Sequence, residues 1–140
     1  MVRHRARQAG FRRITTPVIE YTELFQRGIG DGTDIVSKEM YTFQDRKERS
    51  LTLKPEGTAG VARAYIEHGM NQWPKPVLLY YFEPHFRYDR PQKGRYRQFW
   101  QLGFEVLGES DPALDAQVIY MAQKIFSDLG IADVFELQLN

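Results

Sequence analysis

Two long stretches in the second half of the chain alternate between hydrophobic and polar positions. In residues 98–108 the even positions are mostly apolar and the odd positions mostly polar, and residues 77–88 show a similar split. Side chains alternate between the two faces of a strand, so each stretch predicts a strand with one face toward a core. Only a short loop, residues 88–95, separates them, and we therefore expect the two strands to pair.

Shorter patterns fill the rest of the chain. Apolar spacing and capping residues predict helices at residues 1–10, 22–27, 57–68 and 112–129. Short β-like runs predict further strands at residues 11–14, 40–44, 50–53 and 134–139. Helices placed between and after runs of strands indicate an α+β fold, with a largely antiparallel sheet flanked by helices.

Composition narrows the class of protein only moderately. The 140 residues suffice for one domain, and the net charge of +1 means that any affinity for polyanions must come from local clusters. The chain contains no Cys, its three His residues show no metal-ligand spacing, and we expect no metal site. The absence of Cys, of a secretory signal and of an apolar run of ~20 residues favours a cytoplasmic protein without a membrane segment.

A cluster of positive charge marks the loop between the two long strands. Five cationic side chains lie within eleven residues, at positions 87, 90, 93, 95 and 97. Such a cluster favours a compact polyanion, for example a nucleoside triphosphate. Strand alternation places Arg87, Phe99, Gln101 and Glu105 on one face, and Gly103 would leave a floor open for a small ligand. From the alternation alone, a solvated polar sheet face fits equally well.

The sequence around this loop resembles motif 2 of the histidyl-tRNA synthetases, which are class II aminoacyl-tRNA synthetases. Residues 38–45 and 51–60 also resemble that family, and residues 11–36 resemble its motif 1. The resemblance covers essentially the whole chain, residues 1–140. It implies an antiparallel class II catalytic core, a ligase of protein biosynthesis that activates histidine with ATP.

The resemblance also implies how ATP is bound. Arg87 would be the catalytic residue that holds the α-phosphate, and Phe99 would lie against the adenine ring. Asp89 would lie beside the adenine, where the family usually has Glu. Mg²⁺ would arrive with ATP. Lys54 stands where the family commonly has Arg.

A second group of residues is implied for histidine. Glu56, Thr58 and Gln101 would bind the amino end of the amino acid. Arg95 and Glu105 would line the same pocket, and Glu105 would accept a hydrogen bond from the imidazole N–H. A buried carboxylate gives selectivity, because a ligand without that donor leaves it unpaired.

The resemblance carries expectations about extent and partners. We expect a partial catalytic domain with motifs 1 and 2 but without motif 3 or the anticodon-binding domain. Such a chain should bind ATP weakly and form histidyl-adenylate poorly or not at all. Motif 1 implies a homodimer, and tRNA(His) would be a partner of the full-length enzyme.

Alternatives remain open at this point. A synthetase-like paralogue serves as the regulatory subunit of ATP phosphoribosyltransferase and senses histidine, and a pure dimerisation module is a third interpretation. Five arginines near the N-terminus could contact tRNA phosphates, although a solvated helix and turn explains them as well. They are Arg3, Arg5, Arg7, Arg12 and Arg13.

Overall fold

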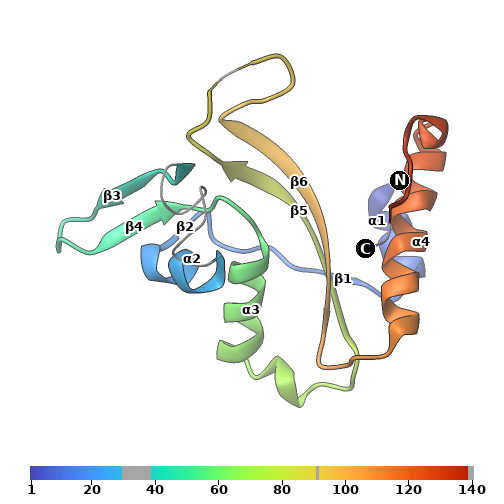
Figure 1. Cartoon of the computed structure of the whole chain (residues 1–140). Helices are drawn as coiled ribbons and strands as arrows, with labels where there is room; N and C mark the ends of the chain where they lie inside the picture. The colour runs from blue at the N-terminus through green and yellow to red at the C-terminus, as the bar shows by residue number, and fades with distance from the viewer. Residues whose placement is uncertain (30–38, 91, 139–140) are drawn as a thin grey trace.

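The computed structural model describes residues 1–29, 39–90 and 92–138 (Figure 1). The first sheet has the strand order β1-β5-β6: Arg12–Arg13, Val77–Phe86 and Gln98–Leu107. The second has the order β2-β4-β3: Ile19–Tyr21, Ser50–Leu53 and Thr42–Gln44. The α-helices are α1 Val2–Gln8, α2 Thr22–Ile29, α3 Thr58–Glu67 and α4 Pro112–Asp128. Short 3-10 helices are η2 Met70–Gln72 and η3 Ala132–Val134.

The long hairpin predicted from alternation forms most of the first sheet. Strands β5 and β6 pair antiparallel along their full length, from Val77 opposite Leu107 to Phe86 opposite Gln98. Strand β1 adds to β5 in parallel, and the pairs within the second sheet are antiparallel. The α+β prediction with a largely antiparallel sheet is therefore confirmed.

Helices cover both faces of the first sheet (Figure 1). Helices α1 and α4 lie on one side, where Ala6, Phe11 and Tyr80 form a buried cluster. Helix α3 lies on the other side, where Val61 packs against a cluster that includes Val77 and Leu79. Burying each large apolar side chain contributes about 1.5–3 kcal/mol, so both faces of the hairpin stabilise the fold.

Hydrogen bonds between side-chain hydroxyl groups supplement the backbone ladder of the second sheet. The Thr22 hydroxyl lies 2.8 Å from those of Thr52 and Ser50, and the Thr42 and Thr52 hydroxyls are 3.1 Å apart. The sequence prediction found β4 with correct bounds but started β3 two residues early. It missed β2, because Pro17 precedes a run too short to show alternation.

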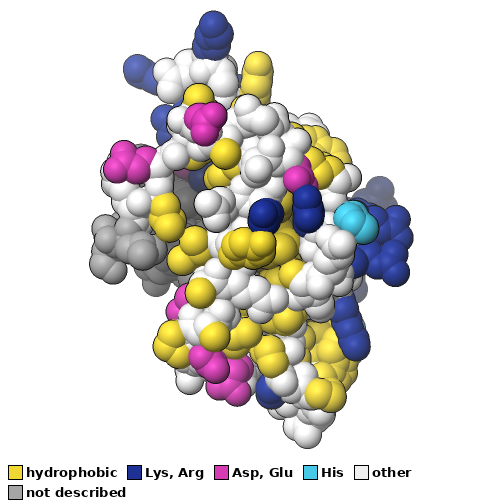
Figure 2. Space-filling model, turned by 90° about the vertical axis from the view of Figure 1, so that its right-hand side faces the viewer, with side chains coloured by type: hydrophobic (Ala, Val, Ile, Leu, Met, Phe, Trp, Pro, Cys, Tyr) yellow, Lys and Arg dark blue, Asp and Glu magenta, His cyan; other side chains and the backbone are white. Residues whose placement is uncertain are grey.

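The predicted strand at residues 134–139 is wrong over the part that the structure describes. Gly130 has φ +70 and turns the chain back after α4, so this segment lies along the helix. The Phe135 ring stacks on that of Phe126 of α4, with centroids 4.2 Å apart. The segment therefore packs on a helix instead of pairing with a strand, and apolar side chains lie at the surface on this side of the molecule (Figure 2).

A second correction concerns two aromatic residues that the alternation assigned to the core. Phe82 and Trp100 contact each other, with ring centroids 5.0 Å apart, but are 48% and 59% exposed. The buried cluster under α1 and α4 forms around Tyr80, Leu102 and Phe104, nearer the other end of the hairpin. Alternation gives the face of a residue but not how far a helix extends along that face.

Within the described residues, none of the helices combines the length and apolar character required to span a bilayer.

Candidate functional site

One face of the β5–β6 hairpin gathers the polar residues singled out by the sequence. His85 lies opposite Phe99, Glu83 opposite Gln101, and Leu79 opposite Glu105. Residues directly opposite in a ladder point to the same face, so Phe99, Gln101 and Glu105 share the face predicted from alternation. The first turn of α3 meets this face near Glu105.

A cation and an aromatic ring form one end of this face. The Arg87 guanidinium carbon lies 5.2 Å from the centre of the Phe99 ring, within cation–π range. Arg87 Nε also donates to the carbonyl oxygen of Pro55, at 2.9 Å. These contacts hold a permanent positive charge beside a flat apolar surface.

Carboxylates and a hydroxyl form the other end. The Thr58 hydroxyl donates to Glu105 Oε1 at 2.8 Å. The Glu56 carboxylate accepts from the backbone N–H groups of Thr58 and Ala59, at 2.5 and 2.9 Å. These are N–H groups at the start of α3, where an anion interacts favourably with the helix dipole. Two acidic groups are thus fixed on neighbouring elements.

Tyr81 occupies the space that the sequence predicted to be open above Gly103. A Cβ atom on Gly103 would lie 2.1 Å from Tyr81 Cζ, and one on Gly57 would lie 2.3 Å from the same atom. The ring is therefore held between two glycine backbones, and the prediction of an open floor at Gly103 is wrong. The Tyr81 hydroxyl interacts with Thr58 and Glu105. Two glycines in contact with one large side chain were the signal that a strand-by-strand analysis missed.

Burial shifts the pKa values of two side chains at the carboxylate end of the site, Tyr81 and Glu105. Burial, together with the Glu105 carboxylate, raises the pKa of Tyr81 to about 12. Burial also raises the pKa of Glu105, and the nearby Glu56 charge acts in the same direction. The two carboxylates therefore favour a ligand that brings positive charge or N–H donors between them.

Replacing Gly103 by Ala should disturb this end directly. The new methyl group would overlap the Tyr81 ring, and overpacking of this kind costs about 1–3 kcal/mol. Urea denaturation of the single variant, of Tyr81→Leu and of the double variant measures this. We expect the Ala substitution to cost much less in the Tyr81→Leu background, and equal costs in both backgrounds would contradict the contact.

Two of the loop cations, Arg95 and Arg97, have protein partners. Arg95 Nε lies 2.5 Å from Asp89 Oδ2, so these two predicted site residues contact each other. The Arg97 guanidinium carbon lies 4.3 Å from the centre of the Tyr88 ring. The structure thus places Arg95 and Asp89 together in the loop and does not bring Arg95 to Glu105. Part of the loop charge is balanced without an external anion.

Two buried acceptors lie between the two ends of the site. Gln101 Oε1 and His85 Nε2 have no hydrogen-bond partner among the residues the structure describes. His85 Nδ1 lies 3.1 Å from the carbonyl oxygen of Glu83 and must donate to it, so Nε2 carries the lone pair. Burial and the Lys54 charge lower the pKa of His85 to about 4, and the imidazole is neutral.

Comparisons with known proteins agree with the resemblance. The family model of the histidyl-tRNA synthetases matches residues 1–140. A protein named histidine–tRNA ligase from Desulforudis audaxviator (strain MP104C) is 59% identical over all 140 residues of this chain. The chain spans 33% of that relative's length, about a third.

Solved structures show the same fold. Apo histidyl-tRNA synthetase of S. aureus superposes with a TM-score of 0.76 at 41% identity, over 92% of this chain and 29% of that chain. A Bacillus halodurans protein described as an ATP phosphoribosyltransferase regulatory subunit/histidyl-tRNA synthetase gives 0.73 at 24% identity, over 94% and 32%. The second likeness concerns the fold alone. The family model matches the whole chain, and the chain therefore belongs to the histidyl-tRNA synthetase family.

Proposed function

We propose that this chain is part of a histidine–tRNA ligase and that the shared face of β5 and β6 binds ATP and histidine. One observation carries the proposal: a cation–aromatic pair at one end of this face and a Glu56–Thr58–Glu105 group at the other. The first end suits a phosphate and a planar base. The second suits an ammonium group and an imidazole.

At the first end, Arg87 binds the α-phosphate and Phe99 lies against the adenine ring. Arg is suited to this position because its charge is permanent and its donors are forked. Asp89 accepts from the adenine amino group, which requires the Asp89 carboxylate to turn from Arg95. In the described residues, no group of three or more His, Asp or Glu side chains could hold a metal ion. Mg²⁺ would enter with ATP as part of the MgATP substrate.

At the second end, Glu105 accepts from the imidazole N–H of histidine. Glu56 and Gln101 Oε1, which accepts no hydrogen bond from the described residues, face the α-ammonium group, and Thr58 holds Glu105 in place. Arg95 joins this pocket by leaving its ion pair with Asp89. An amino acid without a ring donor would leave the half-buried Glu105 carboxylate with only the Thr58 and Tyr81 hydroxyls as partners.

The reaction follows from positioning and charge. A carboxylate oxygen of histidine attacks the α-phosphorus in line, a new P–O bond forms, and the bond to the bridging oxygen breaks as pyrophosphate leaves. Arg87 stabilises the negative charge that develops on the α-phosphate. No enzyme nucleophile takes part. The histidyl group then passes to tRNA(His), and we propose a homodimer in the cytoplasm as the working form.

Two substitutions should separate the two ends of the site. Loss of a hydrogen bond to a charged group costs about 1.5–3 kcal/mol, which is about 10- to 100-fold in affinity. Arg87→Gln should weaken ATP binding by this factor and leave histidine binding within about twofold. Glu105→Gln should do the reverse. Isothermal titration calorimetry with each ligand measures both, and Arg46→Gln, in the remote β3–β4 turn, is the control.

The ligand pattern of the unmodified chain tests the proposal as a whole. Binding of both ATP and histidine supports a ligase core. Histidine alone would indicate the regulatory class, and a folded chain that binds neither would contradict the proposed site. The names of relatives at 59% identity favour the ligase.

A further inference from the structure

A buried histidine lies between the two ends of the site and has no role in the reaction described above. His85 is 0% exposed and lies opposite Phe99 in the ladder. The ring centroids of His85 and Phe99 are 6.0 Å apart, and those of His85 and Tyr81 are 5.8 Å apart. The imidazole therefore lies between an aromatic ring of the ATP end and one of the histidine end.

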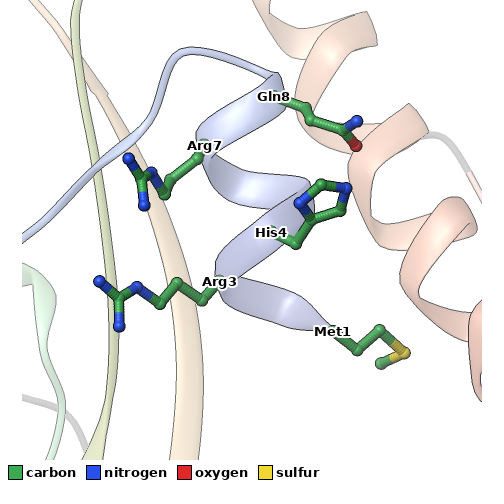
Figure 3. Close-up of a pocket in the computed structure, with 5 residues that line it drawn as sticks. All are labelled: Met1, Arg3, His4, Arg7 and Gln8. Carbon is green, nitrogen blue, oxygen red and sulfur yellow. The ribbon is translucent and has the colours of Figure 1, made fainter.

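The other two histidines have different surroundings. His4 is exposed on α1, beside a surface hollow that Met1 and Gln8 also line (Figure 3). His68 is exposed at the C-terminal end of α3. Filling the space between two aromatic rings does not require polar atoms, because an apolar side chain would do the same. The ring nitrogens of His85 therefore need a separate explanation.

One ring nitrogen of His85 is fixed as a donor. Nδ1 lies 3.1 Å from the carbonyl oxygen of Glu83, which can only accept, so Nδ1 carries the proton. Nε2 is then an acceptor, and it has no hydrogen-bond partner among the described residues. Burial, and after it the Lys54 charge, lower the pKa of His85 to about 4. At neutral pH Nε2 is thus a buried acceptor that lacks a donor.

Gln101 is the neighbour that can supply this donor. It lies opposite Glu83, and His85 is two residues further along β5, so Gln101 and His85 are diagonal neighbours on one face. Diagonal neighbours are about 7–8 Å apart, which long side chains can span. Gln101 Oε1 is also buried and also has no partner among the residues described. This face therefore contains two buried acceptors, and each of them needs a donor.

A turn of the Gln101 amide would remove both defects. The amide has two donors on its nitrogen and an acceptor oxygen at the other position. When the two atoms exchange places, an N–H can donate to His85 Nε2, and the oxygen leaves the buried position. Because unpaired buried acceptors are costly, we expect the turned amide in the unliganded protein as well.

We propose that His85 is a positioning residue that orients the Gln101 amide toward the α-ammonium group of histidine. This rests on the proposed function, in which Gln101 Oε1 accepts from that group. The ammonium donates to Gln101 Oε1, Gln101 Nε2–H donates to His85 Nε2, and His85 Nδ1–H donates to the Glu83 carbonyl. Each hydrogen bond polarises the next, so the oxygen that faces the ligand becomes a better acceptor.

Nuclear magnetic resonance of the isotope-labelled, unliganded chain tests the contact directly. A hydrogen bond between two nitrogens gives a scalar coupling across the bond. We expect this coupling between Gln101 Nε2 and His85 Nε2, and slow exchange of the bonded amide proton with water. No coupling, with an amide that exchanges as fast as an exposed one, would overturn the proposal, whether His85 Nε2 is free or bound to water.

Calorimetry separates a positioning role from a packing role. The variants are His85→Leu, Gln101→Leu and the double variant, with His68→Leu as the matched control. We expect His85→Leu to weaken histidine binding about 3- to 10-fold, the effect of one neutral hydrogen bond. ATP binding should stay within about twofold. In the Gln101→Leu background the His85 substitution should cause no further loss of histidine binding.

Other outcomes contradict one claim or the other. Equal losses of ATP and histidine binding in His85→Leu would show a packing role and overturn the proposal. The same loss with and without the Gln101 side chain would also overturn it. A chain that shows the nitrogen–nitrogen coupling but binds neither small ligand would contradict the proposed active site, while the contact between His85 and Gln101 would be supported.

Discussion

Replacing Glu83 by Gln should lower the free energy of unfolding by about 3–5 kcal/mol, because it leaves a buried cation without its counter-charge. Glu83 forms an ion pair with Lys54, and both side chains are buried. Lys54 Nζ also donates to the Thr16 carbonyl oxygen at 3.1 Å, and the Thr16 N–H donates to Glu83 Oε1 at 3.1 Å. The group ties the segment before β2 to β4 and β5. Urea denaturation at pH 7 measures the loss.

The double variant Lys54→Met/Glu83→Gln is the matched control. It removes both charges, and the amide oxygen of the new side chain on β5 can still accept from the Thr16 N–H. Replacing a buried ion pair by uncharged groups of similar volume is often nearly neutral, so most of the lost stability should return. A single variant within about 1 kcal/mol of the parent protein would contradict the account.

Acidification should destabilise the fold through His85. The pKa of this buried imidazole is lowered to about 4 from 6.5, first by burial and then by Lys54, with Arg87 in the same direction and Glu83 opposing. Below pH 6.5 the His85 imidazole binds a proton in the unfolded chain, whereas in the folded chain it stays neutral until about pH 4. The contribution of the neutral imidazole to the free energy of unfolding is therefore fully present above pH 6.5. It falls by about 3 kcal/mol as the pH drops from 6.5 to about 4.

The variant His85→Leu isolates this contribution. It removes the titrating group, so its stability should change less than that of the parent between pH 6.5 and 4.5, as measured by urea denaturation at each pH. Glu105 acts in the opposite sense: its raised pKa makes the folded state gain protons more readily as pH falls, in both proteins. Parallel pH profiles for the two proteins would rule out the role assigned to His85.

Alternation along the two long strands predicted much of the site. It placed Phe99, Gln101 and Glu105 on one face, and the ladder confirms this, because a regular strand has a strict period of two. Asp111 and Pro112 predicted the start of α4, and the Asp111 side chain accepts from the Ala113 N–H at 2.9 Å.

Tertiary contacts decided what local patterns could not. Tyr81 fills the space over Gly103 because α3 brings Gly57 to the same ring. The ion pair of Asp89 with Arg95 depends on how the loop closes, and Lys54 meets Glu83 across 29 positions of sequence. None of these contacts has a periodic signature. The strand predicted at residues 134–139 failed for the same reason, since α4 provides a nearer apolar surface.

The contact between the first and last α-helices has a consequence for synthesis on the ribosome. The Arg5–Asp128 pair spans 123 positions, and the Ala9 carbonyl accepts from Gln117 across 108. At a synthesis rate of about 5–20 residues per second, α4 is completed roughly 5–25 s after α1. During that time the Arg5 guanidinium lacks its Asp128 partner and the Ala9 carbonyl lacks its Gln117 donor. Helix α1 is therefore fixed to α4 only after both long strands of the first sheet have been made.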